Sequence, residues 1–292
     1  TAVTVGPAVI VMPPAITARP PSAFVTVTSA VPSAAVADTV TGTVICVAVR
    51  PTAAALSRLM IVIASRSAEP LEATAAELTA ETGRRAHAVP ADTTDEASVR
   101  HLVARAVELL GRVDILVNSA ARVSGGGRPP GLADITHEAF LDEMNTKVFG
   151  YLRCAREVAP LMQAQGWGRI INISGLAARS SGSALGSMRN VSVAALTKTL
   201  ADELGPHGIN VTVVHPGTSR TERTPGMLAA AMERDGITLE EAERRMANNA
   251  IRRLVSAEEI ADVITFLASP RSVSINGDAV AVGGGAGNAI YY

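Results

Sequence analysis

One segment, from Gly168 to Gly217, limits the folds open to this chain more than any other. It consists of an apolar, β-branched run (GRIINIS), a loop of small residues, an amphipathic helical stretch and a second apolar run (INVTVVH) that ends in Pro-Gly. Such runs indicate buried strands, and a helix between them indicates a crossover between parallel neighbours. Ligands bind at the carboxyl edge of sheets of this kind. The loop after Ile173 is therefore a predicted binding position.

The same alternation of strand and helix extends through most of the chain. It favours right-handed crossovers and a parallel sheet covered on both faces. We therefore predict an α/β fold with a doubly wound parallel sheet, Rossmann-like, in a single domain over residues 41–292. The predicted strands are 43–49, 61–65, 86–91, 114–119, 169–173, 210–215 and 277–284, and the predicted helices are 52–60, 69–82, 95–110, 137–165 with a break at Pro160, a helix around Ser187 and 256–268.

Two parts of the chain interrupt this alternation. Residues 1–40 are rich in Val, Ala, Thr and Pro and keep no helical or strand period, so we expect a poorly ordered or loosely docked extension. Residues 218–253 form an insertion with a helical, charged and methionine-containing middle. We interpret this insertion as a lid that selects the substrate.

Charge and composition argue against several classes of partner. The 26 basic and 27 acidic side chains nearly cancel, which is not typical of proteins that bind nucleic acid or a membrane surface. No apolar run reaches the ~18 residues of a membrane span, and no basic region precedes the first apolar run as it would in a signal peptide. Cys46 and Cys154 lack metal-type or CxxC spacing. We expect a cytoplasmic protein with a small-molecule substrate and no metal.

Polar and small residues follow several predicted strands, where they could form a site. They are Ser65-Arg66, Asp92-Thr93, Asn118-Ser119-Ala120, Ser174 and Pro216-Gly217, with Thr221 shortly after and Asn145 inside the long helix. Structural roles are the alternative, since Asp92 could cap the next helix and Asn118 could be a turn residue. Asn145 is disfavoured locally in a helix interior, which favours a functional role.

Together these residues resemble the short-chain dehydrogenase/reductase family over about residues 40–285. The resemblance implies that Ser174 orients a substrate carbonyl and that Asn145 supports a proton-relay water. It also implies a dinucleotide cofactor, with Asp92, followed by Thr93, at its adenine ring and Pro216-Gly217 beside its nicotinamide. The residues that would bind this cofactor are Gly42, Ser65, Arg66, Asp92, Thr93, Asn118, Ser119, Ala120, Asn190, Pro216, Gly217 and Thr221.

The pair Ser65-Arg66 bears on which dinucleotide is used. In such folds an acidic residue at this position suits a free 2′-hydroxyl, whereas an arginine accommodates a 2′-phosphate. The pair therefore predicts NADP rather than NAD. An exposed arginine at the end of a strand is the alternative interpretation.

Two parts of the family pattern are missing. The family's glycine-rich turn lets the backbone approach the pyrophosphate; here Gly42 could begin it, but the next glycine is Gly83. The family's Tyr-x-x-x-Lys pair falls by count on Gly186 and Asn190. Asn190 can bond to a ribose hydroxyl but carries no charge, and glycine does no proton chemistry.

Three functions therefore remain open. The first is an oxidoreductase similar to 3-oxoacyl reductases, which interconverts a small carbonyl and its alcohol with NADP(H) through Ser174, Asn145 and Asn190. The second is a catalytically inactive ligand-binding or regulatory protein, and the third is a cofactor-independent lyase. Tyr151 and His215 are possible substitutes for the missing tyrosine.

The family also implies subunit contacts through its two long helices. Here those helices carry apolar positions at Phe149, Leu152, Val191 and Ala195. We therefore expect a homodimer or homotetramer.

Overall fold

A seven-stranded sheet runs through the centre of the domain in the order β10-β9-β8-β7-β4-β5-β6. The computed structural model describes residues 60–121, 130–221 and 224–287, together with the backbone of four short strands before residue 48. The strands of the sheet are β4 (Thr43–Val47), β5 (Met60–Ala64), β6 (Ala86–Ala88), β7 (Ile115–Asn118), β8 (Gly168–Ile173), β9 (Ile209–Pro216) and β10 (Ala279–Val282).

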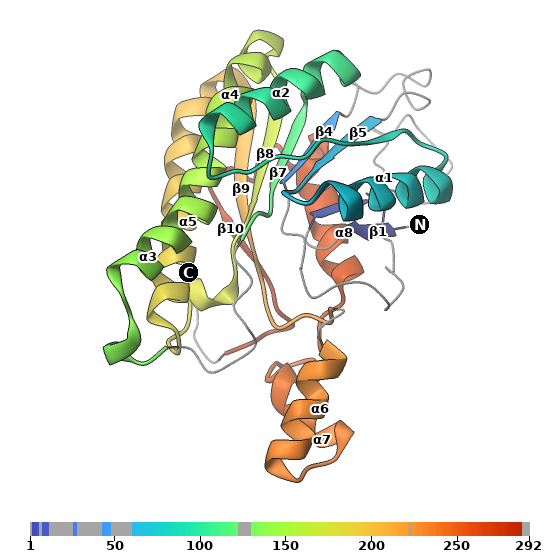
Figure 1. Cartoon of the computed structure of the whole chain (residues 1–292). Coiled ribbons are helices and arrows are strands. Elements are labelled where there is room, and N and C mark those ends of the chain that lie inside the picture. The colour runs from blue at the N-terminus through green and yellow to red at the C-terminus, as the bar shows by residue number, and fades with distance from the viewer. Residues whose placement is uncertain are drawn as a thin grey trace.

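Helices connect these strands and cover both faces of the sheet (Figure 1). The α-helices are α1 (Ala68–Thr82), α2 (Glu96–Leu110), α3 (His137–Glu143), α4 (Gly150–Gln165), α5 (Ala184–Leu204), α6 (Thr224–Asp235), α7 (Leu239–Ala247) and α8 (Ala257–Ala268), with a π-helix η3 (Met144–Phe149) between α3 and α4. Short 3₁₀ turns are η2 (Leu132–Asp134), η4 (Leu176–Ala178), η5 (Gly205–His207) and η6 (Pro270–Ser272).

The alternation of side chains along the strands divides the core into two layers. Ile61 and Ile63 of β5 face a cluster built with α1 and α8. Val62 and Ala64 face the opposite cluster, which α2, α4 and α5 complete. A strand with a period of two and apolar residues on both faces is what a doubly wound sheet requires. The predicted fold class is therefore confirmed.

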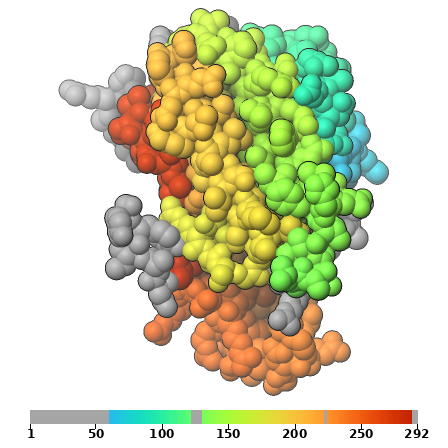
Figure 2. Space-filling model, turned by 90° about the vertical axis from the view of Figure 1, so that its left-hand side faces the viewer, coloured from blue at the N-terminus to red at the C-terminus, as the bar shows by residue number. Residues whose placement is uncertain are grey.

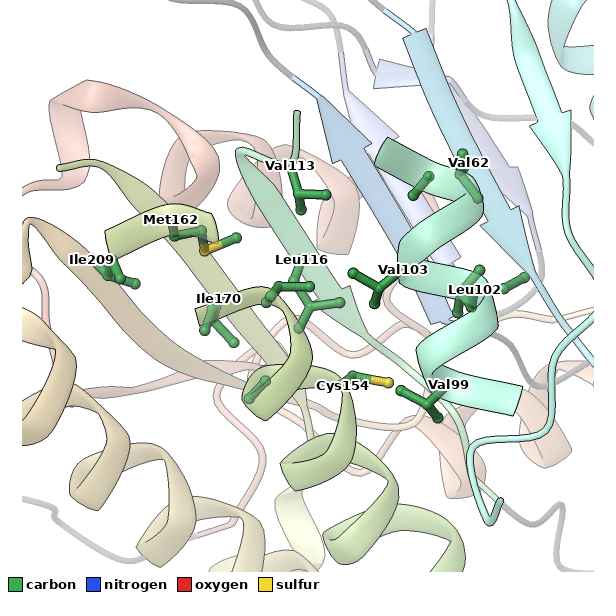
Figure 3. Packing of buried hydrophobic residues seen from close by; sticks show 14 of the residues in the cluster. Val62, Val99, Leu102, Val103, Val113, Leu116, Cys154, Met162, Ile170 and Ile209 are labelled. Carbon is green, nitrogen blue, oxygen red and sulfur yellow. The ribbon is translucent and has the colours of Figure 1, made fainter. Parts of the chain in front are cut away.

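The second cluster shows how a core poor in aromatic residues is filled (Figure 3). Leu102 of α2 and Cys154 and Met162 of α4 pack over Leu116 and Ile170 of the sheet, and all five are fully buried. Replacement of a leucine by alanine in such surroundings costs ~2–5 kcal/mol. Cys154 acts here as a small core side chain, as the absence of a metal-type neighbour predicts.

One strand departs from the all-parallel sheet. β4 pairs antiparallel with both β5 and β7, whereas the other neighbouring strands pair in parallel. Thr43 therefore lies opposite Ala64 and Asn118, at the carboxyl edge of the parallel strands. Val47 lies opposite Met60, at the other edge. The prediction of a parallel first strand was wrong in direction; a crossover helix predicted over 52–60 falls largely outside the described residues.

The long helix predicted over residues 137–165 is three segments, and its break is not at Pro160. The chain widens into η3 at Met144, and α4 then continues through Pro160 to Gln165. Pro160 is exposed, and so is Arg156 one turn before it, whose carbonyl loses its partner. Water can satisfy that carbonyl, which explains why the helix persists.

Both chain regions outside the alternation carry regular structure. β1 (Ala2–Val5), β2 (Ala8–Val11) and β3 (Thr26–Val27) form a small antiparallel sheet that lies against α8. The predicted insertion contains α6 and α7, which extend away from the sheet (Figure 1). A capping box of Ser256 and Glu259 opens α8. The division at residue 40 and the role of the insertion as a lid stay predictions.

Candidate active site

Parallel strands bring polar residues to one edge of the sheet. Asn118 ends β7, Ser174 directly follows β8, and Pro216 ends β9. The pairing is in register, with Asn118 opposite Asn172. Ser65 follows β5 on the other side of β4. The structure thus brings the residues predicted after these strands to the same edge.

A chain of side-chain amides joins this edge to helix α5. Asn118 Nδ2 donates to Asn172 Oδ1 at 2.9 Å, and Asn172 Nδ2 donates to Thr197 Oγ1, also at 2.9 Å. All three side chains are buried. Among the described residues, Asn118 Oδ1 and the Ser119 hydroxyl are buried polar atoms without a partner. Unpaired buried atoms are costly and rare, so both point to a ligand or ordered water at the strand ends.

Three side chains meet just beyond β8. Lys147 Nζ donates to the Ser174 carbonyl oxygen at 3.0 Å and lies 3.3 Å from Asn190 Oδ1. The Ser174 hydroxyl donates to the Asn190 carbonyl oxygen at 3.1 Å. All three residues are at least nine-tenths buried. Lys147 thus contacts both Ser174 and Asn190. These two residues were predicted from the sequence as site residues, and Lys147 was not.

Lys147 reaches this position from the π-helix η3. A π-helical turn is rare in proteins and is frequent at functional sites. Only 4% of Lys147 is exposed, and burial lowers the pKa of its ammonium to about 7. The charge of Arg189 lowers that pKa as well, and the charge of Glu143 opposes the effect. The amine can therefore exchange a proton near neutral pH.

A signal for Lys147 was present in the sequence. Tyr151, Cys154, Val158 and Met162 form the buried face of α4. Lys147 precedes Tyr151 by one helical turn, so helical spacing places it on the same face. A lysine is almost never buried without a specific partner. A charged residue on the apolar face was therefore the feature to notice.

The two proposed substitutes for a catalytic tyrosine are held in other roles. The Tyr151 hydroxyl donates to the Ile173 carbonyl oxygen at 2.8 Å, and burial raises its pKa well above 10. His215 Nδ1 accepts the Gly175 N–H at 3.4 Å. Burial lowers the pKa of His215 to about 4, with smaller contributions from the charges of Arg179 and Lys147. Tyr151 stays protonated and His215 stays neutral at physiological pH.

Gly186 and Asn190 lie one turn apart near the start of α5. Ser183 caps that helix, and its hydroxyl accepts the Gly186 N–H at 3.1 Å. A Cβ atom on Gly186 would lie 2.8 Å from the same hydroxyl oxygen. The cap and the absence of a side chain at residue 186 are thus mutually dependent.

The side chain of Asn145 lies in a different environment from the one predicted. Its Oδ1 accepts from Arg153 Nη2 at 2.8 Å, and Arg153 also donates to the Asn145 carbonyl oxygen. No hydrogen bond within the described part of the chain joins Asn145 to Ser174. A role for Asn145 in proton relay stays a prediction, and Lys147 is the η3 side chain that contacts Ser174.

Known proteins with similar sequences or structures identify the family of this chain. A family model described as enoyl-(acyl carrier protein) reductase matches residues 52–287. The short-chain reductase protein NovJ of Streptomyces niveus is 33% identical over 229 residues, which cover 78% of this chain and 84% of the relative. This chain belongs to the short-chain dehydrogenase/reductase family.

Two further proteins are similar to this chain. The NADPH-dependent reductase BacG of Bacillus subtilis is 28% identical over 229 residues, covering 77% of this chain and 87% of the relative. The crystal structure of an actinorhodin polyketide ketoreductase with NADPH is 30% identical, with a TM-score of 0.68, and the match covers 78% of this chain and 86% of that one.

The predicted adenine-binding residues connect the loop after β6 to η3. Asp92 Oδ1 accepts from both the backbone and the hydroxyl of Thr94, so Asp92 forms a local turn. The cap of α2 is Asp95 instead. The Thr93 hydroxyl lies 3.5 Å from the Thr146 carbonyl oxygen and packs closely on Gly150. Contact of Asp92 and Thr93 with an adenine ring stays a prediction for this short-chain dehydrogenase/reductase.

The predicted Pro216-Gly217 turn closes the edge beside β10. The Gly217 N–H donates to the Val282 carbonyl oxygen at 2.9 Å. A Cβ on Gly217 would lie 2.7 Å from the Cα of Gly283, so the two chains touch through glycine backbone. Thr221 is exposed and bonds through its N–H to the Thr224 hydroxyl at the start of α6.

The remaining predicted cofactor residues differ in accessibility. Ser65 is buried, and its hydroxyl donates to the Ser67 carbonyl oxygen, whereas Arg66 is exposed. Ala120 is buried. Gly42 lies outside the described residues, but Thr43 after it starts β4 at the carboxyl edge of the parallel strands.

No group of His, Cys, Asp and Glu side chains suited to a metal ion occurs in residues 60–121, 130–221 and 224–287. Nor does any helix in those ranges have the length and apolar character to cross a membrane.

The neutral state of His215 leads to a prediction about acid stability. From pH ~6.5 down to ~4 the unfolded imidazole binds a proton that the folded one does not, so protonation favours unfolding as the pH falls. We expect the His215→Asn variant to lose less unfolding free energy than the wild type between pH 7 and 4.5, measured with urea. His101→Asn, at an exposed position, is the matched control. Identical pH dependence in the wild type and the His215 variant would contradict the buried neutral imidazole.

Proposed function

We propose that this protein is an NADP(H)-linked reductase that interconverts a small carbonyl compound and its alcohol. The observation that carries the proposal is the buried cluster of Lys147, Ser174 and Asn190 at the carboxyl end of β8. BacG is named as an NADPH-dependent reductase, and the actinorhodin ketoreductase was crystallised with NADPH. These names favour the oxidoreductase over the inactive ligand-binding protein and the lyase.

Several residues at the strand ends suit a dinucleotide. Asn118 Oδ1 and the Ser119 hydroxyl are buried and lack partners among the described residues, so they can serve a ligand. Arg66 is exposed after β5, where its guanidinium can bind a 2′-phosphate. Asp92 and Thr93 are assigned to the adenosine end of the same ligand. Bound NADPH would supply the hydride for the reduction.

The remaining cofactor assignments lie closer to the nicotinamide. Ser65 would accompany Arg66 at the ribose, Ala120 would line the sheet edge, and Asn190 would bond to a ribose hydroxyl. Pro216, Gly217 and Thr221 would lie beside the nicotinamide amide. Of these, Asn190 already has its amide oxygen directed at the cluster, 3.3 Å from Lys147 Nζ.

The residues of this chain do not fit the pyrophosphate of the dinucleotide in the way that the family's glycine-rich turn does. β4 runs opposite to the other strands, so the chain after Val47 leaves from the amino edge of the sheet, away from Ser174. No glycine occurs between Gly42 and Gly83 to let backbone approach phosphate there. We therefore expect weak binding of the cofactor, dominated by contacts at its two ends.

We also propose that this member lacks the tyrosine and lysine of the family. Gly186 and Asn190 take their places by count on α5, and Lys147 contributes a positive charge from η3 instead. Ser174 would orient the substrate carbonyl through its hydroxyl. A 3-oxoacyl group is the proposed substrate class, and the insertion carrying α6 and α7 would select among acyl groups as a lid.

Removal of the Ser174 hydroxyl tests the reductase directly. We expect Ser174→Ala to lower kcat/KM for NADPH-dependent reduction by ~10²–10³-fold, because a hydrogen bond to the developing alkoxide is lost. The measurement is NADPH consumption across a panel of 3-oxoacyl thioesters and small ketones. Ser181→Ala, at an exposed position in the same loop, should leave turnover unchanged. Equal activity of the two variants would rule out the assigned role of Ser174.

Arg66 provides a test of the cofactor. Loss of a charge-assisted bond worth ~1.5–3 kcal/mol corresponds to ~10–100-fold in affinity. We expect Arg66→Ala to weaken NADPH binding by that factor and NADH binding by ~2-fold or less, measured by fluorescence titration. Arg100→Ala on the exposed face of α2 is the control. Failure of the wild type to bind either dinucleotide at millimolar concentration would exclude the dehydrogenase function.

We further propose that this protein forms a homodimer or homotetramer through the face of α4 and α5. These two helices lie side by side on one surface of the molecule (Figure 2). Phe149, which ends η3 directly before α4, and Met188 and Val191 of α5 are large apolar side chains with exposed fractions of 51%, 44% and 50%. Ala195 is exposed on the same helix, and Leu152 is half-buried. Exposed apolar residues grouped in this way mark interaction sites.

A charge placed in this face should prevent self-association. We expect light scattering to give a dimer or tetramer for the wild type and a monomer for Val191→Arg, because an arginine would be buried without a partner. Leu239→Arg, equally exposed but on α7, should leave the mass unchanged. A wild-type monomer at micromolar concentration would exclude the proposed interface.

A further inference from the structure

The cluster at Ser174 contains one titratable group whose protons are not all committed. Lys147 Nζ has three hydrogens and two acceptors in the described structure, namely the Ser174 carbonyl oxygen and Asn190 Oδ1. The Tyr151 hydroxyl spends its single hydrogen on the Ile173 carbonyl oxygen. His215 Nδ1 is occupied by the Gly175 N–H. Lys147 alone among these three combines a spare hydrogen with a pKa, of about 7, that allows transfer near neutral pH.

The acceptors of Lys147 place it beside the Ser174 hydroxyl. One acceptor is the carbonyl group of Ser174 itself. The other is the side chain of Asn190, whose backbone carbonyl accepts from the Ser174 hydroxyl. The ammonium, the hydroxyl and the Asn190 amide therefore form one connected group. The Ser174 hydroxyl gives its one hydrogen to the Asn190 carbonyl, so it must turn from that carbonyl to bind a substrate oxygen. A substrate oxygen bound in this way would lie next to the ammonium.

The charges around Lys147 come from each element packed on it. Glu143 from α3 and Arg189 from α5 form an ion pair with each other, and their charges act on the Lys147 pKa in opposite directions. The charges of Lys147 and of Arg179, after η4, both lower the pKa of His215 of β9. The hydroxyl of Tyr151 of α4 is bonded to the Ile173 carbonyl oxygen. No described carboxylate bonds to Lys147, which leaves the amine free to lose its proton.

We propose that Lys147 is the proton donor of the reduction, a catalytic residue contributed by η3. This inference rests on the proposed reductase function. As hydride adds to the carbonyl carbon, the C=O π bond breaks, and its electron pair takes a proton from Lys147 Nζ onto oxygen. The alcohol leaves, and the neutral amine regains a proton from solvent. The Ser174 hydroxyl and Asn190 hold the substrate oxygen and the amine in place.

The small number of lysines makes the titration of Lys147 directly observable. Lys147 and Lys198 are the only two lysines in the sequence. Lys198 is exposed on α5 and paired with Asp202. Protein labelled at the lysine ε-carbon should give two NMR signals, which Lys147→Met and Lys198→Met assign. We expect the Lys147 signal to titrate with a midpoint near 7 in the protein without substrate. A midpoint near the ordinary ~10.4 of lysine would overturn the proposal.

Kinetics on the same variants test the catalytic role. Lys147→Met should lower kcat by ~10²–10⁴-fold, the usual range for loss of a positioned acid, with the NADPH dissociation constant changed by little. Wild-type kcat for reduction should fall as the pH rises through ~7 and the donor is lost. Lys147→Arg keeps the charge but cannot give up a proton, so it should be equally slow. Lys198→Met should match the wild type.

The outcomes separate this inference from the proposed function. If the wild type reduces no carbonyl, the reductase function fails, whatever the NMR titration shows. If the wild type is active and Lys147→Arg is too, proton donation by Lys147 is excluded. If Lys147→Met raises only the dissociation constant for NADPH, the residue holds the cofactor and the proposal is again wrong. A folded Lys147→Arg variant, checked by thermal unfolding, keeps these results interpretable even where Lys147→Met is unstable.

Discussion

A buried ammonium group must be held by acceptors, and much of this site follows from that requirement. Lys147 has almost no contact with water, so each hydrogen bond that it makes replaces solvation that the charge has lost. The Ser174 carbonyl and the Asn190 amide provide two such bonds. Turning Asn190 toward the lysine in turn fixes the start of α5 relative to η3. The π-helical turn, the end of β8 and the first turns of α5 are thus linked through a single nitrogen atom.

The frame around this cluster is rigid for a different reason. Asn118, Asn172 and Thr197 join β7, β8 and α5 through a buried chain of hydrogen bonds. Such networks are strong inside a protein because little water competes for their donors. The ion pair of Arg189 and Glu143 links α5 to α3 as well. The reactive groups therefore sit on elements whose relative positions are fixed before any ligand binds.

The fold class could be predicted from the sequence because the same pattern of an apolar strand followed by a helix recurs along most of the chain. Most strands from β5 to β10 are rich in apolar residues, and each is separated from the next by a helix or loop with recognisable ends, such as the capping box of Ser256 and Glu259. The direction of β4 was not predictable, since an isolated β-branched run reads the same way in either orientation. The helix break predicted at Pro160 was wrong, because a proline on the solvent-exposed side of a helix leaves a carbonyl that water can satisfy.

For the site, the sequence located the strand ends but not the contacts between helices. Ser174 was found because it follows a predicted strand, and Asn190 because it falls by count on the lysine position of the family pattern. Lys147 was missed because the family pattern directed attention to Asn145, two positions earlier, whose side chain binds Arg153. A helical turn of π type rotates every later side chain relative to an ordinary helix. The family pattern pointed to Asn145, whereas the spacing of the buried face of α4, extended back by one turn from Tyr151, reaches Lys147.

The contact between Gly217 and Gly283 limits how this site can change. A side chain on either residue would meet backbone or Leu176 at less than normal contact distance, as the 2.7 Å and 2.2 Å separations show. Substitution of either glycine would therefore require the neighbouring backbone or Leu176 to shift. Under the proposed role of the insertion as a lid, new substrate preferences would arise more readily from α6 and α7 than from this contact. Those helices stand clear of the sheet and can vary without disturbing the lysine cluster.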